Sequence, residues 1–150
     1  MKKVVSLVTI FVLCLTALAG CSGSKEVDLK TVLSDINSKY SLDLKELTDS
    51  NDLKKYYSID TEDVKQFAAE INSDSNSRVE IVLVEAVDAD AASRVNDALS
   101  KTYTSIVTQY SGYNAKKLPM VEACKVTQDG NYVTMIVADQ GPEILETFYG

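Results

Sequence analysis

The chain has 150 residues, with 22 acidic and 15 basic side chains and no histidine. The acidic balance argues against a nucleic-acid-binding protein, because phosphates require clustered Lys and Arg, and it disfavours flat adsorption onto anionic lipid. The lack of histidine removes the commonest metal ligand and the usual general base at neutral pH. We interpret the acidic residues as solvated faces, the alternative being recruitment of a basic partner or a cation.

The first 20 residues have the pattern of a secretory signal. Lys2 and Lys3 precede an apolar stretch over residues 4–17, which is shorter than the roughly 20 residues that a membrane-spanning helix needs. A basic start, a short apolar stretch and small residues at its end are typical of a signal peptide. An uncleaved anchor helix and an ordinary signal cut nearby are the alternatives.

The segment Leu18-Ala19-Gly20-Cys21 resembles the bacterial lipobox. In that motif small side chains precede the cleaved bond, and the cysteine thiol receives a diacylglyceryl group with fatty acids such as palmitate. The resemblance implies cleavage after Gly20 and a lipid anchor at Cys21 on the outer face of the cell membrane. We therefore predict a signal peptide over 1–20, a lipidated cysteine with a short tether over 21–26, and one domain over 27–150.

Cys124 is the cysteine that remains when Cys14 leaves with the signal and Cys21 is lipidated, so we expect no intramolecular disulfide. Removal of residues 1–20 takes away two lysines and no acid, which leaves a net charge of 13 minus 22, or −9. Cys124 lies between apolar positions of a predicted strand. We expect a buried structural thiol there, and a reactive thiol, which needs an open electropositive site, is the alternative.

The first half of the domain contains two predicted helices followed by two predicted strands. Apolar residues at helical spacing predict a helix over 27–40 with Asp28 as its N-cap or as an acid of its first turn. Ser50-Asn51-Asp52 predicts the start of a short helix. Residues 64–71 fit helix or strand spacing, and we predict a strand from Gln66, because the polar residues that follow then form a hairpin loop.

Residues 78–87 predict the second strand of that hairpin. Their β-branched residues fall on both faces, which is typical of a central strand covered on both sides. Asp88 or Asp90 is expected to cap the longest helix, which ends near Gly112. A loop over 114–119 follows.

The last third predicts a hairpin and a final helix. Strands over 120–127 and 132–138 flank Asp129-Gly130, a tight-turn signal. Pro142 is expected in the first turn of the final helix. The order after the N-terminal helices is therefore ββαββα. It predicts an α+β fold with a four-stranded, mainly antiparallel sheet packed against helices.

Three stretches carry a family resemblance: residues 57–64, with the sequence YSIDTEDV, residues 78–99 and residues 126–139. They resemble small uncharacterised lipoproteins of Gram-positive, mostly clostridial, bacteria that are known only as a domain of unknown function. The resemblance covers roughly residues 30–140. It implies a Gram-positive envelope lipoprotein, and it supplies no activity and no functional residue beyond Cys21.

The sequence has no recognisable catalytic motif, since no serine lies in G-x-S-x-G and no histidine can activate one. The acids Asp60, Glu62 and Asp63, and the pair Asp88 and Asp90, have oxygen atoms that hard cations such as calcium prefer. EF-hand spacing is absent, and turn formation and helix capping account for both groups. We therefore expect no catalytic residue, no metal ligand and no cofactor.

The tyrosines divide into two predicted groups. Tyr103 and Tyr110 lie on the apolar stripe of the longest helix and are expected in the core. Tyr57 and Tyr113 are expected nearest to an exposed groove, because an aromatic ring with a polar tip suits a binding surface.

These patterns favour a non-catalytic, lipid-anchored domain whose partners are the membrane, through Cys21, and an envelope protein, peptide or wall component, with no nucleic acid. A carboxylate-dependent envelope enzyme is the competing class. A solute receptor of an importer would need two lobes, for which the chain is too short. An edge strand with unpaired amides would favour peptide binding, whereas a deep cleft with two converging acids would favour the enzyme.

Overall fold

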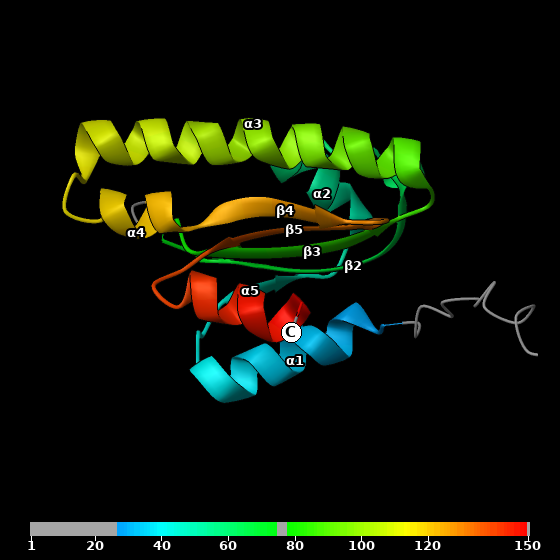
Figure 1. Ribbon diagram of the computed structural model, residues 1–150, viewed down its shortest axis with the longest axis horizontal. Helices are drawn as coiled ribbons and strands as arrows, with labels where there is room; N and C mark the ends of the chain where they lie inside the picture. The colour runs from blue at the N-terminus through cyan, green and yellow to red at the C-terminus, as the bar shows by residue number, and fades with distance from the viewer. Residues whose placement is uncertain (1–26, 75–77, 150) are drawn as a thin grey trace, which may run out of the picture.

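The computed structural model of the protein describes residues 27–74 and 78–149, so the predicted signal peptide, its lipobox and Cys21 lie outside the described residues. Between these limits a five-stranded antiparallel sheet lies between two layers of helices (Figure 1). The strand order is β1-β2-β3-β5-β4. The predicted α+β class with a mainly antiparallel sheet is confirmed.

The sheet has one strand more than the four predicted. The strands are β1 (Lys45–Leu47), β2 (Val64–Ile71), β3 (Glu80–Ala86), β4 (Lys125–Asp129) and β5 (Tyr132–Val137). The additional strand, β1, has three residues, of which Leu47 alone is buried. A strand that short has no alternation to detect in the sequence. β2 begins two residues before the predicted Gln66, because a bulge extends it.

The central position of β3 is confirmed, since all seven of its residues are buried. Val82 and Val84 face the helical layer that contains α3, and Ile81 and Leu83 face the opposite layer. A strand covered on both faces explains the continuous apolar sequence that predicted it.

The upper layer in Figure 1 consists of α2 (Ser50–Tyr57), α3 (Ala89–Tyr113) and α4 (Leu118–Ala123). The 3-10 helix η1 (Thr61–Asp63) leads into β2. The Asp88 carboxylate accepts a hydrogen bond from the Ala91 amide (2.8 Å), which confirms Asp88 as the N-cap of α3. α3 continues through Gly112 and ends one residue later than that glycine.

The lower layer consists of α1 (Leu29–Tyr40) and α5 (Gly141–Tyr149) (Figure 1). Asp28 accepts hydrogen bonds from the amides of Lys30 and Thr31, as an N-cap does, and so confirms the prediction. Leu29, Leu33 and Ile36 bury one face of α1 in the core below the sheet, where Ile144 of α5 joins them. None of the described helices is both long and apolar enough to cross a bilayer.

The strand predicted over 120–127 is wrong in its first half, where residues 118–123 form α4. Pro119 lies in the first turn of that helix, a position where proline is well tolerated. Val121 is fully buried against the upper core. The Tyr103 hydroxyl lies 2.9 Å from the Val121 carbonyl and 2.8 Å from the Cys124 carbonyl. These contacts give hydrogen-bond partners to carbonyl groups at the C-terminal end of α4. The helix is too short to show the helical spacing of apolar residues in the sequence.

Cys124 links α4 to β4 and is buried, as predicted, although it lies outside a strand. Its thiol donates to the Ala138 carbonyl at 3.4 Å, and burial raises the pKa of the thiol. A Cβ at Gly141 would lie 2.7 Å from the Cys124 sulfur and 3.3 Å from the Ile136 carbonyl oxygen. The start of α5 therefore approaches the sheet at a distance that glycine allows and a larger residue does not.

Candidate functional site: an open strand edge beside α1

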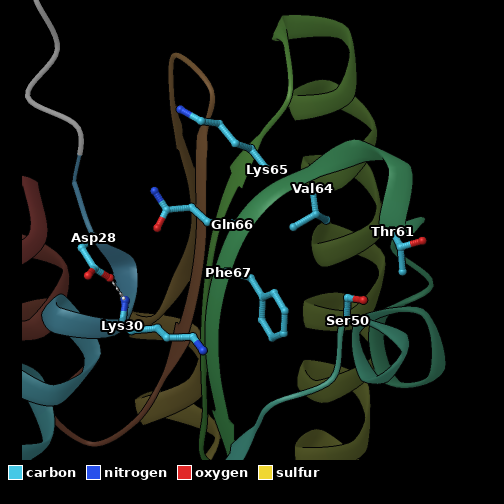
Figure 2. A pocket seen from close by; sticks show the side chains of 8 residues that line it. All are labelled: Asp28, Lys30, Ser50, Thr61, Val64, Lys65, Gln66 and Phe67. Atoms are coloured by element: carbon cyan, nitrogen blue, oxygen red, sulfur yellow. Dashed lines mark hydrogen bonds between the residues drawn. The ribbon is translucent and has the colours of Figure 1, made fainter.

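One edge of the sheet is only half covered. β1 pairs with Ala69, Glu70 and Ile71 of β2. β2 starts at Val64, so residues 64–68 extend past the end of β1. Figure 2 looks onto this uncovered part of β2, with α1 on one side and the start of α2 on the other. The N-terminal half of β2 is therefore an edge strand inside a groove.

The hydrogen-bond pattern shows which backbone groups are directed into the opening. The Asn72 amide donates to the Val79 carbonyl (2.9 Å), so the backbone of Asn72 faces β3. In an antiparallel sheet the groups of alternate residues point to the same side. Glu70 and Ala68 therefore also face β3, and Phe67 faces away from it. Because β1 ends opposite Ala69, the N–H and C=O of Phe67 are directed into the opening.

We call this opening the β2 groove. It has a volume of about 340 Å³ and is lined by side chains from α1, α2, η1 and β2, namely Asp28, Lys30, Ser50, Thr61, Val64, Lys65, Gln66 and Phe67. In Figure 2 Gln66 projects toward the start of α1 and Lys65 leaves β2 on the same side, whereas Phe67 projects toward α2. The groove thus has a polar wall on the side of α1, and on the other side Val64 and Phe67 together with the hydroxyl groups of Ser50 and Thr61.

Gln66 attaches the start of α1 to the sheet. Its amide nitrogen donates to the Val27 carbonyl (2.7 Å) and to Glu85 Oε2 (2.6 Å), and its oxygen accepts from the Leu29 amide (3.1 Å). Burial acts to raise the pKa of Glu85, but hydrogen bonds from Lys65 and Gln66 outweigh it, and the pKa is lowered overall. The polar wall is therefore held by a closed network around an ionised carboxylate.

The register of β2 changes at Lys65, the extra residue of a bulge between Val64 and Gln66. The Lys65 ammonium lies 2.8 Å from Glu85 Oε1. Bulges bend a strand and interrupt its pairing. In Figure 2 β2 curves toward η1 at this bulge.

Lys30 supplies a positive charge at the mouth of the groove. In Figure 2 its side chain extends from α1 toward β2. Within residues 27–74 and 78–149 it forms no ion pair. The groove therefore combines a free strand edge, the partly buried ring of Phe67 and an available ammonium. This set suits an extended peptide segment that carries an acidic residue.

Three of the five acidic residues singled out in the sequence have structural roles, whereas Glu62 and Asp90 are exposed. Asp63 is buried and is contacted by Arg94 through two hydrogen bonds (3.0 and 2.5 Å), and the bond from Arg94 lowers the pKa of Asp63. Asp60 forms an ion pair with Lys54. Asp88 caps α3. In the part of the chain that the structure describes, no three His, Cys, Asp or Glu side chains are grouped as metal ligands.

The prediction for the tyrosines is right for Tyr103, Tyr110 and Tyr113, and it holds in part for Tyr57, which is buried but lines two surface hollows. Tyr103 and Tyr110 pack in the upper core, and Tyr113 is 92% exposed beside a hollow at the end of α3. Tyr57 is 2% exposed, and its hydroxyl donates to Glu80 Oε2 (3.1 Å). It lies on the buried face of α2 with Leu53, four residues earlier, whereas Tyr56 faces out.

A buried carboxylate that the sequence analysis missed lies below the sheet on β2. Glu70 is 6% exposed, and its Oε1 accepts from the Asn37 amide of α1 (2.5 Å). Glu70 Oε2 and Asn37 Oδ1 are buried and have no hydrogen-bond partner among the described residues. Glu46 lies directly opposite Glu70 on β1. Burial and the charge of Glu46 raise the pKa of Glu70, although the Asn37 bond opposes them.

Replacement of Glu70 by glutamine is expected to stabilise the protein at neutral pH. Folding raises the pKa of Glu70. Its carboxyl group therefore does not lower the free energy of unfolding at a pH below the pKa that it has in the unfolded chain. As the pH rises from there toward the pKa in the folded protein, the group ionises in the unfolded chain first, and the free energy of unfolding falls. Glu70→Gln should therefore increase the free energy of unfolding by about 1–2 kcal/mol at pH 7, the usual cost of an unsatisfied buried polar group. The gain should shrink toward about pH 4, where glutamate itself becomes protonated.

Urea unfolding at both pH values measures the effect. Glu146→Gln is the control, because Glu146 is exposed on α5 and is not among the charges that shift the pKa of Glu70, and it should change stability by less than about 0.5 kcal/mol. A loss of stability in Glu70→Gln at pH 7 would show that the ionised carboxylate is needed.

The whole chain was compared with protein families, curated proteins and solved structures. A family model described as "Domain of unknown function (DUF4358)" matches residues 37–138. This match covers more than half of the chain and includes all five strands. No curated protein and no solved structure matches.

Proposed function

Because the chain belongs to the DUF4358 family, whose description assigns no activity, we propose a function from the residues themselves. The protein is a non-catalytic, lipid-anchored binding domain of a Gram-positive envelope. It binds an extended peptide segment of an envelope protein in the β2 groove. The observation that carries the proposal is the half-uncovered edge of β2, with the backbone groups of Phe67 directed into the opening.

Strand addition explains the composition of the groove. A peptide that continues the line of β1 would exchange hydrogen bonds with the N–H and C=O of Phe67, as in other proteins that bind a strand at a sheet edge. Its side chains would alternate between the Phe67 ring and the polar wall. A carboxylate on the segment would pair with Lys30, and an exposed ion pair of this kind contributes about 0.2–1 kcal/mol.

The anchoring part of the proposal depends on the lipobox-like segment that ends at Cys21. A diacylglyceryl group provides two acyl chains, and two chains anchor a protein stably where one gives only marginal binding. Confinement to the membrane surface raises the local concentration of the domain near membrane-bound partners. A groove of modest affinity can then be occupied in the cell.

Photocrosslinking in intact cells tests the binding site. A benzophenone amino acid is placed in the full-length protein at Ser50 or Thr61, which both line the groove and leave Lys30 in place, and at the exposed Ser105 of α3 as a control. Both groove positions should capture the same short segment of the same envelope protein, identified by mass spectrometry, and Ser105 should not.

A charge reversal makes the test specific to the chemistry of the groove. Lys30→Glu should reduce capture from Thr61 by about tenfold, because it replaces an attractive charge by a repulsive one. Lys39→Glu, an exposed lysine at the other end of α1, should leave capture unchanged. Equal capture from Ser105, or no effect of Lys30→Glu, would contradict the proposal.

A further inference from the structure

The opposite edge of the sheet, formed by β4, has a pattern of its own. We propose that two copies of this chain pair antiparallel through β4, about a two-fold axis at Thr127, to form a continuous ten-stranded sheet. Figure 1 views the sheet from the side of β4, and no helix is drawn in front of that strand. β4 is the terminal strand in the order β1-β2-β3-β5-β4.

The outward-facing backbone groups of β4 fit this pairing. Gly130 and Asn131 form a two-residue turn, with Gly130 at φ 55°. The residues next to such a turn, Asp129 and Tyr132, form a hydrogen-bonded pair. By alternation Thr127 also faces β5, whereas Val126 and Gln128 direct their N–H and C=O groups away from the sheet. In the proposed pair Val126 of each copy would exchange both hydrogen bonds with Gln128 of the other.

The same register brings opposite charges together. With Thr127 opposite Thr127 of the second copy, Lys125 lies opposite Asp129, and the contact occurs twice by symmetry. Both side chains are exposed, and neither forms an ion pair within the described residues. Opposite charges on directly facing strand residues are stabilising, and they specify the register. A shift of the pairing by two residues would lose both contacts.

Thr127 provides a separate observation at the two-fold axis. Its hydroxyl oxygen is shielded from solvent and has no hydrogen-bond partner among the described residues. In the proposed pair the two Thr127 residues form a non-hydrogen-bonded backbone pair, in which side chains approach most closely. Rotation about Cα–Cβ would allow a hydrogen bond between the two hydroxyl groups, a contact known to stabilise facing threonines.

The symmetry is compatible with two lipid anchors in one membrane. The two-fold axis of an antiparallel pair within one sheet is perpendicular to the sheet. The layers that contain α1 and α5 therefore lie on the same side in both copies. The start of α1 lies in that layer, so both chains enter the domain from one side.

Disulfide trapping in cells that express the full-length protein tests the proposal. Facing residues of a non-hydrogen-bonded pair have Cα atoms about 4.5 Å apart, within the range for a disulfide. Thr127→Cys should therefore give a covalent dimer on mild oxidation, at least about tenfold more than Thr104→Cys, an exposed position on α3. Val126→Cys and Gln128→Cys, tested separately, should give little dimer, because each residue faces the other and not itself.

A charge exchange tests the register. In the Thr127→Cys background, Lys125→Asp should reduce the yield of disulfide-linked dimer by about fivefold or more. Adding Asp129→Lys should restore the yield, because each facing pair then has opposite charges again. Trapping at Thr127→Cys that does not exceed the Thr104→Cys level, or a covalent product with a different protein, would overturn the proposal. Failure of the double variant to recover would overturn the register.

Discussion

Replacement of Cys21 by serine is expected to abolish fatty-acid labelling of the protein. The thioether of a diacylglyceryl group forms on the cysteine sulfur, and a hydroxyl does not replace it in a motif that ends on cysteine. Cells grown with an alkyne analogue of palmitate should label the wild-type protein, and Cys21→Ser should reduce the label to background. The loss should be complete, because the sequence predicts one lipidation site.

Cys124→Ser is the matched control, because it removes the buried thiol and leaves Cys21 in place. It should retain full labelling. Mass spectrometry of the mature protein should also find Cys21 at the N-terminus, since cleavage is predicted after Gly20. A mature chain that starts elsewhere, or labelling that survives Cys21→Ser, would contradict the anchor and with it the membrane part of the proposed function. The β2 groove would be unaffected by that result.

Replacement of Leu83 by alanine is expected to have the largest effect on stability. Leu83 is fully buried at the centre of β3 and packs in the core between the sheet and the layer of α1 and α5. Truncation of a buried leucine costs about 2–5 kcal/mol, from lost transfer energy and from the cavity that remains. A domain of this size is stabilised by only about 5–15 kcal/mol. The variant should therefore unfold at much lower urea concentration.

Val87→Ala is the control for this measurement, because Val87 follows the same strand and is 48% exposed. It should change the free energy of unfolding by less than about 0.5 kcal/mol. Equilibrium urea unfolding, followed by circular dichroism, measures both variants. A cost below about 1 kcal/mol for Leu83→Ala would mean that the lower core relaxes around the missing side chain or is packed loosely.

The sequence predicted those parts of the fold in which local signals agree with tertiary packing. The central strand β3 was predicted because it is buried on both faces, and a continuous apolar sequence has few other interpretations in a small domain. Asp28, and Asp88 or Asp90, were predicted at the starts of their helices because capping is a local interaction, and the structure has Asp28 and Asp88 as the N-caps. The turn at Gly130 was predicted because glycine favours the positive φ that it adopts.

The errors arose where short elements depend on distant contacts. β1 is held by its pairing with β2. α4 is held by the packing of Val121 in the upper core and by the hydroxyl of Tyr103. A sequence window of three to six residues shows none of these distant contacts. Tyr57 was expected nearest to an exposed groove, and it does line two surface hollows, but the helical phase of α2 buries most of its ring.

The β2 groove could not have been predicted, because it exists only where β1 stops short of the end of β2. Lys30, Lys65 and Phe67 had no special pattern in the sequence. The general expectation, that an edge strand with unpaired amides would favour peptide binding, named the type of site without its position. Its position depends on strand pairing between residues more than 20 positions apart along the chain.

The hydrogen bond from Gln66 to Val27 has a consequence for which ligands can enter the groove. It fixes the point where the chain enters the domain at the polar wall itself. Five residues lie between Cys21 and Val27, so the covalent length of the chain keeps these two residues within about 20 Å of each other. A lipid at Cys21 would hold the groove at the height of the phospholipid head groups. The groove could then bind segments of neighbouring proteins that lie close to the membrane surface. Segments farther out in the cell wall would be beyond its reach.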